Sequence, residues 1–406
     1  MAACAAPVGA ANYDEAQVGE FTLPDPLAGS EGLRVTNSNQ WLATRRPEIL
    51  ELYREFIFGH SPAPWTNVGF QVWETRTNAL GGKAIRKQIE INFSRTAGGP
   101  LAHLLLYTPV GKPHCPTFLC LQFNGNYTVI NDPAIAILPV WNWKTGQPAM
   151  PKNPVRGEAS RNWKISETLA RGYGIAILDY REIEPDLPGG AGFAYGVRKN
   201  YPDPATNSWG AISAWAWGAS RALDYLSTDP DVDAERVILQ GHSRLGKTVL
   251  WAGAQDTRFA AVIASCSGEM GAALSRRDYG ETVDDVCQRF PYWMSGSFLQ
   301  FSNRWNSLPV DSHFLLSLIA PRPLFLSTGS EDRWGDPRGE FLAARAAAPV
   351  YELFGQSGLT ETEFPPLDQP LRHTVWFNCH TGKHDVLPTD WDLYLDFADA
   401  HFSQNK

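Results

Sequence analysis

Short, wholly apolar segments alternate with helix-forming segments along most of this 406-residue chain, and that alternation constrains its fold more than any other feature. The segments GIAILDY (174–180) and VILQ (237–240) are two of the apolar ones. A parallel strand that helices cover on both faces reads as such a continuous apolar run, because neither face meets water. The sequence therefore predicts an α/β protein, a three-layer αβα sandwich with a mostly parallel central sheet.

The N-terminal part of the chain shows a different pattern. Apolar and polar residues alternate at 67–77, 84–94 and 101–108, which is typical of half-buried strands. We therefore expect an antiparallel N-terminal edge beside the parallel strands. Further strands are expected at 117–123, 174–180, 237–240, 259–264, 323–328 and 374–379, and helices at 37–59, 163–171, 208–227, 247–255, 339–353 and 390–402.

No change of composition divides the chain, so we expect a single α/β domain over residues 37–406. Residues 1–36 are rich in Gly, Pro, Asn and Asp without a sustained period, and we expect an extended N-terminal arm there. Residues 267–319 are more than a crossover between parallel strands requires, which indicates an insertion or cap.

Composition excludes several classes of protein. The 35 basic and 43 acidic residues give a net charge of −8 without long charged blocks, which argues against nucleic acid as a partner. No apolar run approaches the roughly eighteen residues that a membrane-spanning helix needs. The N-terminus, MAACAAP, lacks the basic and apolar regions of a signal peptide, and we interpret it as the start of a secreted or periplasmic chain without its signal.

The six cysteines, at positions 4, 115, 120, 266, 287 and 379, do not have the spacing of a metal site, so no metal is expected. Reduced, buried thiols are the favoured interpretation, and one or two disulfides stay open. The 15 tryptophans also allow two interpretations. They form an aromatic core, or a few of them line a cleft in which indole rings stack on sugars.

The segment RVILQGHSRLGK (236–247) carries the strongest local signal for chemistry. An apolar strand leads into Gly-His-Ser and then into a helix-forming segment, which is the context of a nucleophile elbow. The turn is tight and its neighbours must be small; Gly241 meets that need, whereas Leu245 stands where a second glycine is usual and Gly246 follows one place later. Ser243 would lie at a helix N-terminus, where N–H groups favour a developing negative charge. The alternative is a serine that only caps the helix.

A serine nucleophile needs a base and an orienting acid, which in this kind of fold follow it on loops after later strands. His384 follows the last expected strand and precedes the final helix, so it is the predicted base, with His380 as its competitor. Asp332 follows the preceding strand and is the predicted acid. Glu269, after the strand before that one, is the alternative acid.

Three motifs together resemble the glucuronoyl esterase family of carbohydrate esterases: GHSRLGK at 241–247, DRW at 332–334 and TGKH at 381–384. Supporting stretches are GETV at 280–283, FPYW at 290–293 and LIAPRPL at 318–324, and the resemblance extends over about residues 41–397. It implies an α/β-hydrolase fold and a serine esterase, a 4-O-methyl-glucuronoyl methylesterase. The implied reaction cleaves esters between (4-O-methyl-)glucuronoyl groups of glucuronoxylan and lignin alcohols through an acyl-enzyme, with no metal or cofactor; we expect a monomer.

The resemblance also implies a role for each matching residue. Ser243 is the nucleophile, His384 the general base, and Arg244 adds its guanidinium to the donors that stabilise the oxyanion. An esterified uronate is neutral, so cationic side chains act on it through hydrogen bonds until the oxyanion forms, and then stabilise the transition state more than the ground state. The residues implied to bind the glucuronoyl group are Lys247, Glu281 and Trp334.

Two features depart from the fungal members of that family. Their acid follows the strand after the nucleophile helix, where this chain has Cys266, and this favours Asp332 as the acid, as in some bacterial members. Their disulfide beside the nucleophile and histidine cannot form here, because His242 and Asp385 occupy the two positions. An acetyl xylan esterase or other carboxylesterase of the same fold is the alternative function, and a non-catalytic carbohydrate-binding relative is the third.

Overall fold

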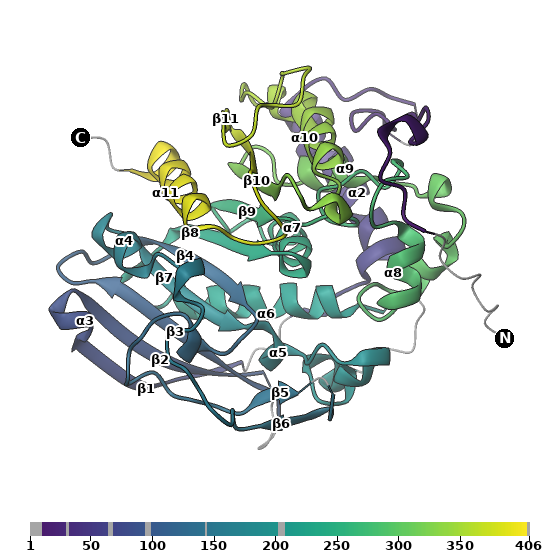
Figure 1. Ribbon diagram of the computed structural model, residues 1–406. Helices are drawn as coiled ribbons and strands as arrows, with labels where there is room; N and C mark the ends of the chain where they lie inside the picture. Colours follow the sequence, from purple (N-terminus) through teal and green to yellow (C-terminus); the bar gives the residue numbers. More distant parts are fainter. Residues whose placement is uncertain are drawn as a thin grey trace.

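A long twisted sheet runs through the computed structural model, which describes residues 10–29, 32–63, 68–93, 99–142, 144–201 and 208–403. Its strands are β1 (Gly69–Asn78), β2 (Ala84–Asn92), β3 (Leu101–Pro109), β4 (Cys115–Gln122), β7 (Gly174–Asp179), β8 (Val232–His242), β9 (Ala261–Ser265), β10 (Leu324–Gly329), β11 (Leu371–Arg372) and β12 (Val375–His380). They are ordered β1-β2-β3-β7-β4-β8-β9-β10-β12-β11 (Figure 1). A separate hairpin pairs β5 (Val140–Asn142) with β6 (Gln147–Ala149).

The sheet is mixed in the way that the sequence predicts. Strands β7, β4, β8, β9, β10 and β12 pair in parallel with their neighbours in that order. The first three strands pair antiparallel with one another, and β3 pairs antiparallel with β7. The expected antiparallel N-terminal edge is thus confirmed, and the short β11 adds a second antiparallel edge strand beside β12.

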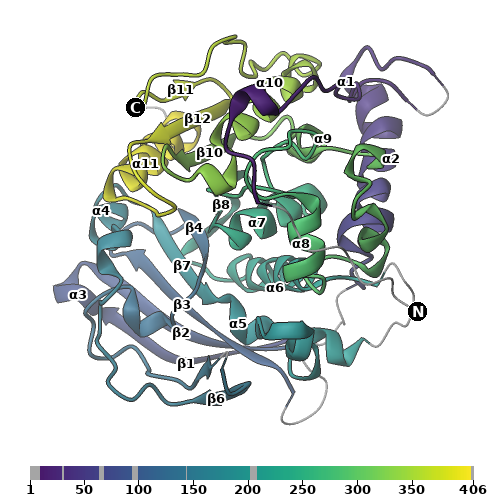
Figure 2. The same ribbon diagram turned by 45° about the vertical axis from the view of Figure 1, so that its right-hand side comes forward.

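Helices cover both faces of this sheet (Figures 1 and 2). They are α1 (Ser38–Gln40), α2 (Arg46–Tyr53), α3 (Ala79–Gly82), α4 (Ile165–Ala170), α5 (Tyr180–Ile183), α6 (Ala211–Leu226), α7 (Arg244–Gln255), α8 (Val283–Arg289), α9 (Ser312–Ser317), α10 (Pro337–Glu352) and α11 (Pro388–Phe402). One apolar core includes residues of α2, α6, α7, α9 and α10, and the other includes residues of α4 and α11. The predicted three-layer αβα sandwich, an α/β-hydrolase fold, is confirmed.

The strands show why their sequences are apolar throughout. Along β3, Leu104 and Leu106 enter one core, whereas Leu105 and Tyr107 enter the other. Successive side chains of a strand point to opposite faces, so a strand with helices on both sides needs an apolar residue at every position. All six residues of β7 are buried. Within the described chain no helix is long and apolar enough to cross a bilayer.

The helix predicted at 37–59 is present but irregular. Its α-helical parts α1 and α2 are joined and extended by π-helical turns at Trp41–Arg45 and Arg54–Phe58. A pattern of apolar residues cannot separate the two helix types, because a single π turn shifts the apolar face only slightly. The helix ends at Gly59, whose φ is 81°, and a Cβ there would lie 2.4 Å from Trp209 Cα.

The carboxyl ends of β8, β9, β10 and β12 lie at one edge of the sheet, because these strands are parallel. The loops that follow them are therefore brought together, although they are far apart in sequence. The long segment between β9 and β10 carries α8 and α9. The N-terminal arm packs against this segment: Gly280 N donates to Asn12 O (2.9 Å), and Arg277 pairs with Glu15 (2.8 Å).

The turn between β8 and α7 brings the strand and the helix close together at Gly241, and this packing can be tested. A Cβ on Gly241 would lie 2.3 Å from the carbonyl oxygen of Leu245 and 2.9 Å from Val249, so Gly241→Ala forces strand and helix apart. We expect this change to lower the free energy of unfolding by about 2–3 kcal/mol, measured by chemical denaturation. Gly69→Ala is the matched control, since its Cβ would meet only Asn92 at 3.7 Å. Equal stability of the two variants would contradict the packing.

Candidate active site

Ser243 occupies the turn between β8 and α7 in a strained backbone conformation. Its φ and ψ are 61° and −129°, a combination that L-residues rarely adopt. Its backbone N–H donates to Ser265 O (2.8 Å), and its own carbonyl accepts from Gly246 N (2.8 Å) at the start of α7. The predicted strand–serine–helix turn is therefore present, with the side chain half-buried at the helix N-terminus.

His384 and Asp332 meet at the same edge of the sheet. Nδ1 of His384 lies 2.6 Å from Oδ2 of Asp332. An ionised carboxylate only accepts, so Nδ1 donates to it and Nε2 is the nitrogen left for a substrate. The Asp332 side chain is 4% exposed, whereas that of His384 is 42% exposed. A buried acid thus orients an imidazole whose other nitrogen is available as a base.

Glu269, the alternative acid, lies elsewhere in the structure. Its carboxylate is buried and accepts from Ser275 Oγ (2.5 Å). Burial raises its pKa well above the usual range, and the nearby Asp311 carboxylate adds to the effect. Of the two carboxylates that the sequence proposes, the described contacts bring only Asp332 to His384.

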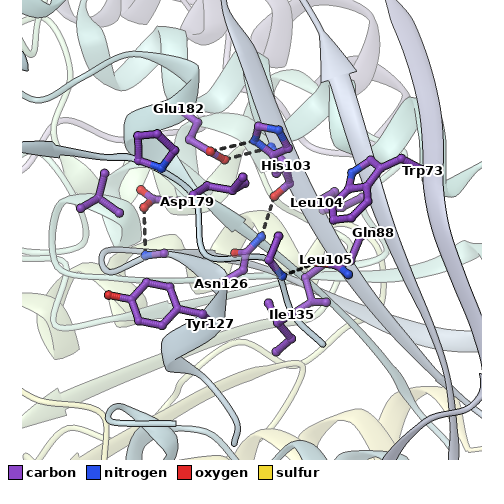
Figure 3. Close-up of a pocket in the computed structure, with 15 residues that line it drawn as sticks. Trp73, Gln88, His103, Leu104, Leu105, Asn126, Tyr127, Ile135, Asp179 and Glu182 are labelled. Atoms are coloured by element: carbon purple, nitrogen blue, oxygen red, sulfur yellow. Dashed lines mark hydrogen bonds and ion pairs between the residues drawn. The ribbon is translucent and has the colours of Figure 1, made fainter. Parts of the chain in front are cut away.

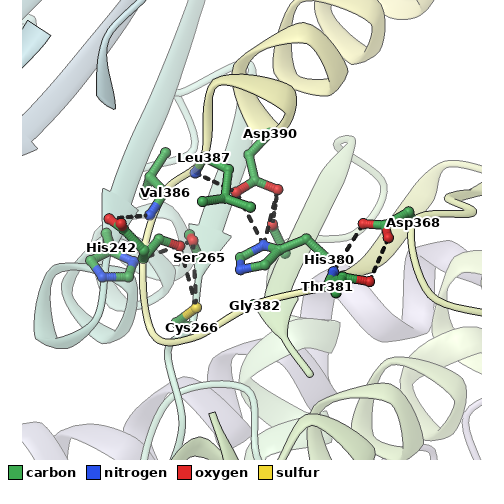
Figure 4. Close-up of polar contacts among 12 residues, drawn as sticks. His242, Ser265, Cys266, Asp368, His380, Thr381, Gly382, Val386, Leu387 and Asp390 are labelled. Carbon is green, nitrogen blue, oxygen red and sulfur yellow. Dashed lines mark hydrogen bonds and ion pairs between the residues drawn. The ribbon is translucent and has the colours of Figure 1, made fainter. Parts of the chain in front are cut away.

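A second, buried histidine–aspartate pair holds the loop that carries His384. His380, the competitor for the role of base, lies at the end of β12 and is 1% exposed. Its Nδ1 faces Asp390 Oδ1 at 3.2 Å (Figure 4). Its Nε2 faces the carbonyl of Lys383 at 3.1 Å. Asp390 also accepts from Leu387 N (2.8 Å). Both ring nitrogens of His380 are engaged, so the pair holds the loop in place.

His242, the residue before Ser243, packs its ring against that of His384. Its ring centroid is 4.6 Å from that of His384. Its Nδ1 lies 3.3 Å from Ser265 Oγ (Figure 4). Burial lowers the pKa of His242 to about 3, and the positive charges that His384, His380 and Arg244 can carry add to the effect. The ring is therefore neutral, and it supports one side of the His384 imidazole through direct ring contact.

Arg244, next to Ser243, is held by a carboxylate that the sequence analysis did not identify. Asp186 pairs with Arg244 Nη1, and it also accepts from Tyr292 OH (2.7 Å), Trp293 Nε1 (3.0 Å) and Tyr180 OH (3.1 Å). The Asp186 side chain is 4% exposed, and the guanidinium lies 4.8 Å from the centre of the Trp293 ring.

The guanidinium of Arg244 has an N–H group without a hydrogen bond to the described residues. Arg244 Nε is buried and has no hydrogen-bond partner within the described chain. The Arg244 side chain as a whole is 32% exposed, so a part of it other than Nε can meet a ligand beside Ser243. The arrangement can therefore supply a donor to an anion that forms next to the serine.

The three residues implied to bind the sugar also lie together. Lys247 is buried one helical turn beyond Ser243; its Nζ donates to Ser267 O (2.6 Å) and lies 3.4 Å from Glu281 Oε2. The backbone N–H of Glu281 donates to Trp334 O (2.8 Å), so the loop of α8 and the loop of Asp332 are joined there. The described contacts use two of the three ammonium donors of Lys247, so one is available to a hydroxyl.

A small polar cavity of about 20 Å³ lies apart from these residues, beside β3 and β7 (Figure 3). Its charged groups are paired: His103 Nδ1 contacts Glu182 (2.9 Å), and Asp179 accepts from Gly125 N (3.0 Å). A space of this size holds about one water molecule. We therefore assign it a structural role. The five described cysteines are all free thiols, and Cys4 lies outside the described residues.

A strained serine, an imidazole and a buried aspartate at the carboxyl edge of a parallel sheet are the arrangement typical of serine hydrolases with the α/β-hydrolase fold. Comparisons with known proteins agree with that class. A family model described as glucuronyl esterase of fungi matches residues 201–355. Carbohydrate esterase MZ0003, from an unknown prokaryotic organism, is 43% identical over 399 residues, which cover 97% of this chain and 92% of that protein.

Solved structures lead to the same family. A glucuronoyl esterase from Solibacter usitatus is 44% identical, with a TM-score of 0.92 over 96% of this chain and 100% of that one. A promiscuous CE15 esterase from a marine bacterial metagenome is 42% identical, with a TM-score of 0.89 over 97% and 100%. This chain belongs to the glucuronoyl esterase family of carbohydrate esterases, and the resemblance that its motifs show is confirmed.

The contact between Asp332 and His384 predicts which acid matters. Asp332→Asn should lower kcat for ester hydrolysis by about 10³- to 10⁴-fold, because an amide favours the wrong tautomer of the imidazole. Glu269→Gln is the matched isosteric control and should change kcat by less than about tenfold. Steady-state kinetics on one ester checks both, and the reverse order of losses would reassign the acid.

Glu340 provides a prediction on pH. Its Oε1 accepts from Gly268 N (2.7 Å) and Ser267 Oγ (3.1 Å), while its buried Oε2 has no partner within the described residues. Burial raises the pKa of Glu340 from 4.5 to about 8. Between these two values the folded chain keeps a proton that the unfolded chain has lost, so the contribution of Glu340 to stability falls as pH rises.

The variant Glu340→Gln removes that proton equilibrium and nothing else that titrates. Relative to wild type, we expect this variant to be more stable at about pH 9 than at about pH 5, that is, to have the larger free energy of unfolding there. Urea denaturation of both proteins at the two pH values gives this difference, in which the other titrating groups cancel. A difference that does not change with pH would contradict the raised pKa.

Proposed function

We propose that this protein is a glucuronoyl esterase that hydrolyses the ester bond between (4-O-methyl-)glucuronoyl groups of glucuronoxylan and lignin alcohols. The observation that carries the proposal is Arg244, next in the chain to the strained Ser243, fixed by an ion pair with the buried Asp186 and still 32% exposed. Family membership over nearly the whole chain supports the same substrate class. A relative from Wolfiporia cocos, 34% identical over 196 residues, is named 4-O-methyl-glucuronoyl methylesterase 1.

The reaction would proceed in two halves. Nε2 of His384 takes the proton of Ser243 Oγ as the oxygen attacks the ester carbonyl, while Asp332 stabilises the imidazolium that forms. Arg244 and backbone N–H groups at the start of α7 stabilise the oxyanion. The alcohol leaves with the proton from His384, and a water molecule that the same imidazole activates then releases the uronate from Ser243.

The sugar would be held by the group of residues around Lys247. Its ammonium donates to a hydroxyl of the glucuronoyl ring, Glu281 accepts from hydroxyls, and Trp334 provides an indole face. Lys247 and Glu281 pair with each other, with side chains that are 5% and 8% exposed, which fixes both before substrate arrives. A pre-organised polar pair of this kind favours a hydroxylated acyl group over a plain acetyl group.

The domain organisation, the location and the oligomeric state of the chain are also proposals. We propose one catalytic domain over residues 37–406, an N-terminal arm over 1–36, an insertion near 267–319, a secreted or periplasmic location and a monomeric state. Parts of the arm, residues 1–9 and 30–31, lie outside the described residues.

Substrate choice separates this proposal from its alternatives. If the polar groups around Lys247 are matched to a glucuronoyl ring, wild type should hydrolyse a methyl glucuronate ester with a higher kcat/KM than a methyl galacturonate ester or an aryl acetate. A preference for the acetate would favour an acetyl xylan esterase. Ser243→Ala should lower kcat by about 10⁴-fold or more. Equal rates for this variant and wild type would favour a non-catalytic carbohydrate-binding relative.

Asp186 is predicted to act through Arg244. Asp186→Asn weakens the ion pair that aims the guanidinium, so we expect kcat to fall by about 10-fold with little change in KM. Arg244→Ala should lose about 10²- to 10³-fold. In the double variant the Asp186 change should add almost nothing, since its target is gone. Additive losses would show that Asp186 does not work through Arg244.

A further inference from the structure

A thiol lies against the proposed catalytic pair. Cys266 follows β9 directly, in a left-handed backbone conformation with a φ of 46°, and is 2% exposed. A ligand atom from each of Cys266, Asp332 and His384 lies within 4.8 Å of the other two. The three residues come from the loops after β9, β10 and β12 and share one small volume. We call them the Cys–Asp–His cluster.

We propose that the Cys–Asp–His cluster is a binding site for a thiophilic divalent cation such as Zn²⁺ or Cd²⁺, and that the bound ion switches the esterase off. Thiolate, imidazole and carboxylate are the ligands that Zn²⁺ takes in proteins, and three of them with one open position form a complete site. A thiolate and a carboxylate carry two negative charges, so the occupied site is neutral. Neutrality matters here because Cys266 and Asp332 are buried.

The cluster needs only a small adjustment to close around an ion. Ligand bonds of about 2.0–2.3 Å in tetrahedral geometry place ligand atoms about 3.4 Å apart. Nδ1 of His384 and Oδ2 of Asp332, now 2.6 Å apart, must therefore separate slightly, and the thiol must approach. His384 is the exposed member of the cluster. Its imidazole can therefore move, and the ion can enter from the solvent side.

Binding changes the protons of the site without any oxidation or reduction. The thiol of Cys266 releases its proton to solvent and binds as a thiolate. The ion takes the lone pair of Nδ1 on His384, and the proton that Nδ1 held moves to Nε2. Nε2 then carries a hydrogen and has no lone pair with which to accept the proton of Ser243. The esterase is inhibited although the serine is untouched.

The binding claim stands on geometry alone, whereas the inhibition rests on the proposed function. The experiment keeps the two apart by following Cd²⁺ through the ultraviolet charge-transfer absorption of its bond to a thiolate. Wild type, Ser243→Ala, Cys266→Ala and Cys287→Ala are titrated with Cd²⁺ as full-length chains. Cys287 is half-buried, outside the cluster and more accessible than Cys266, so its variant is the matched thiol control.

We expect wild type, Ser243→Ala and Cys287→Ala to develop the band with saturation at one equivalent, and Cys266→Ala to lack it. Ester hydrolysis by wild type and Cys287→Ala should fall at least tenfold at saturation. Hydrolysis by Cys266→Ala should equal that of wild type without metal and change less than twofold with it. Thermal denaturation verifies that each variant is folded.

Two results would overturn the proposal: no saturable band in wild type, or the same band and inhibition in Cys266→Ala. If Cys266→Ala does not fold, His384→Ala takes its place, and undiminished Cd²⁺ affinity in that variant overturns the proposal equally. Failure of the proposed function has a different signature. In that case Ser243→Ala hydrolyses the ester as fast as wild type, while the Cd²⁺ band is unaffected.

Discussion

The hydrogen bond between Asp332 and His384 is the interaction on which the rest of the site depends. It joins the loop after β10 to the loop after β12, and the two strands are adjacent and parallel, so their carboxyl ends deliver both side chains to one edge. The carboxylate is buried and the imidazole partly exposed. Burial keeps water from competing for the bond, and exposure leaves the second ring nitrogen accessible to a substrate.

Buried charge is the constraint that shapes the surroundings of this bond. Each ionised group near the serine has a partner of opposite sign or a set of donors: Arg244 has Asp186, and Lys247 has Glu281. An unpaired buried ion costs several kcal/mol, so these pairs fix the cations in position before substrate binds. Glu340 avoids the cost of a buried charge in another way, because its raised pKa keeps its carboxyl group protonated and neutral near neutral pH.

Much of this architecture could be predicted from the sequence. The apolar runs predict every strand of the parallel part, and the positions of Asp332 and His384 after such strands predict that the two side chains meet, as their described contact shows. Those inferences rely on local pattern and on one topological rule, that parallel strands end at the same edge. The sequence ranks Asp332 ahead of Glu269 as the acid but leaves both open, because both follow a strand of the same edge.

Other features have no local signature. Asp186 lies 58 residues before Arg244, in a loop without a motif, and its role emerges only when the chain folds. The irregular turns of the helix at 37–59 are hidden because π and α turns share nearly the same apolar pattern. The sequence indicates only that Cys266 stands where the fungal members carry their acid. Its closeness to His384 follows from the backbone turn after β9.

Proton NMR of the imidazole N–H of His384 tests the central contact most directly. A short bond to a buried carboxylate should shift the Nδ1 proton far downfield and protect it from exchange with water. We predict that wild type and Glu269→Gln show this resonance, and that Asp332→Asn and His384→Ala lack it. A His384 resonance that stays downfield without the Asp332 carboxylate, or that vanishes in Glu269→Gln, would contradict this contact; the His380–Asp390 pair is told apart because its resonance persists in His384→Ala.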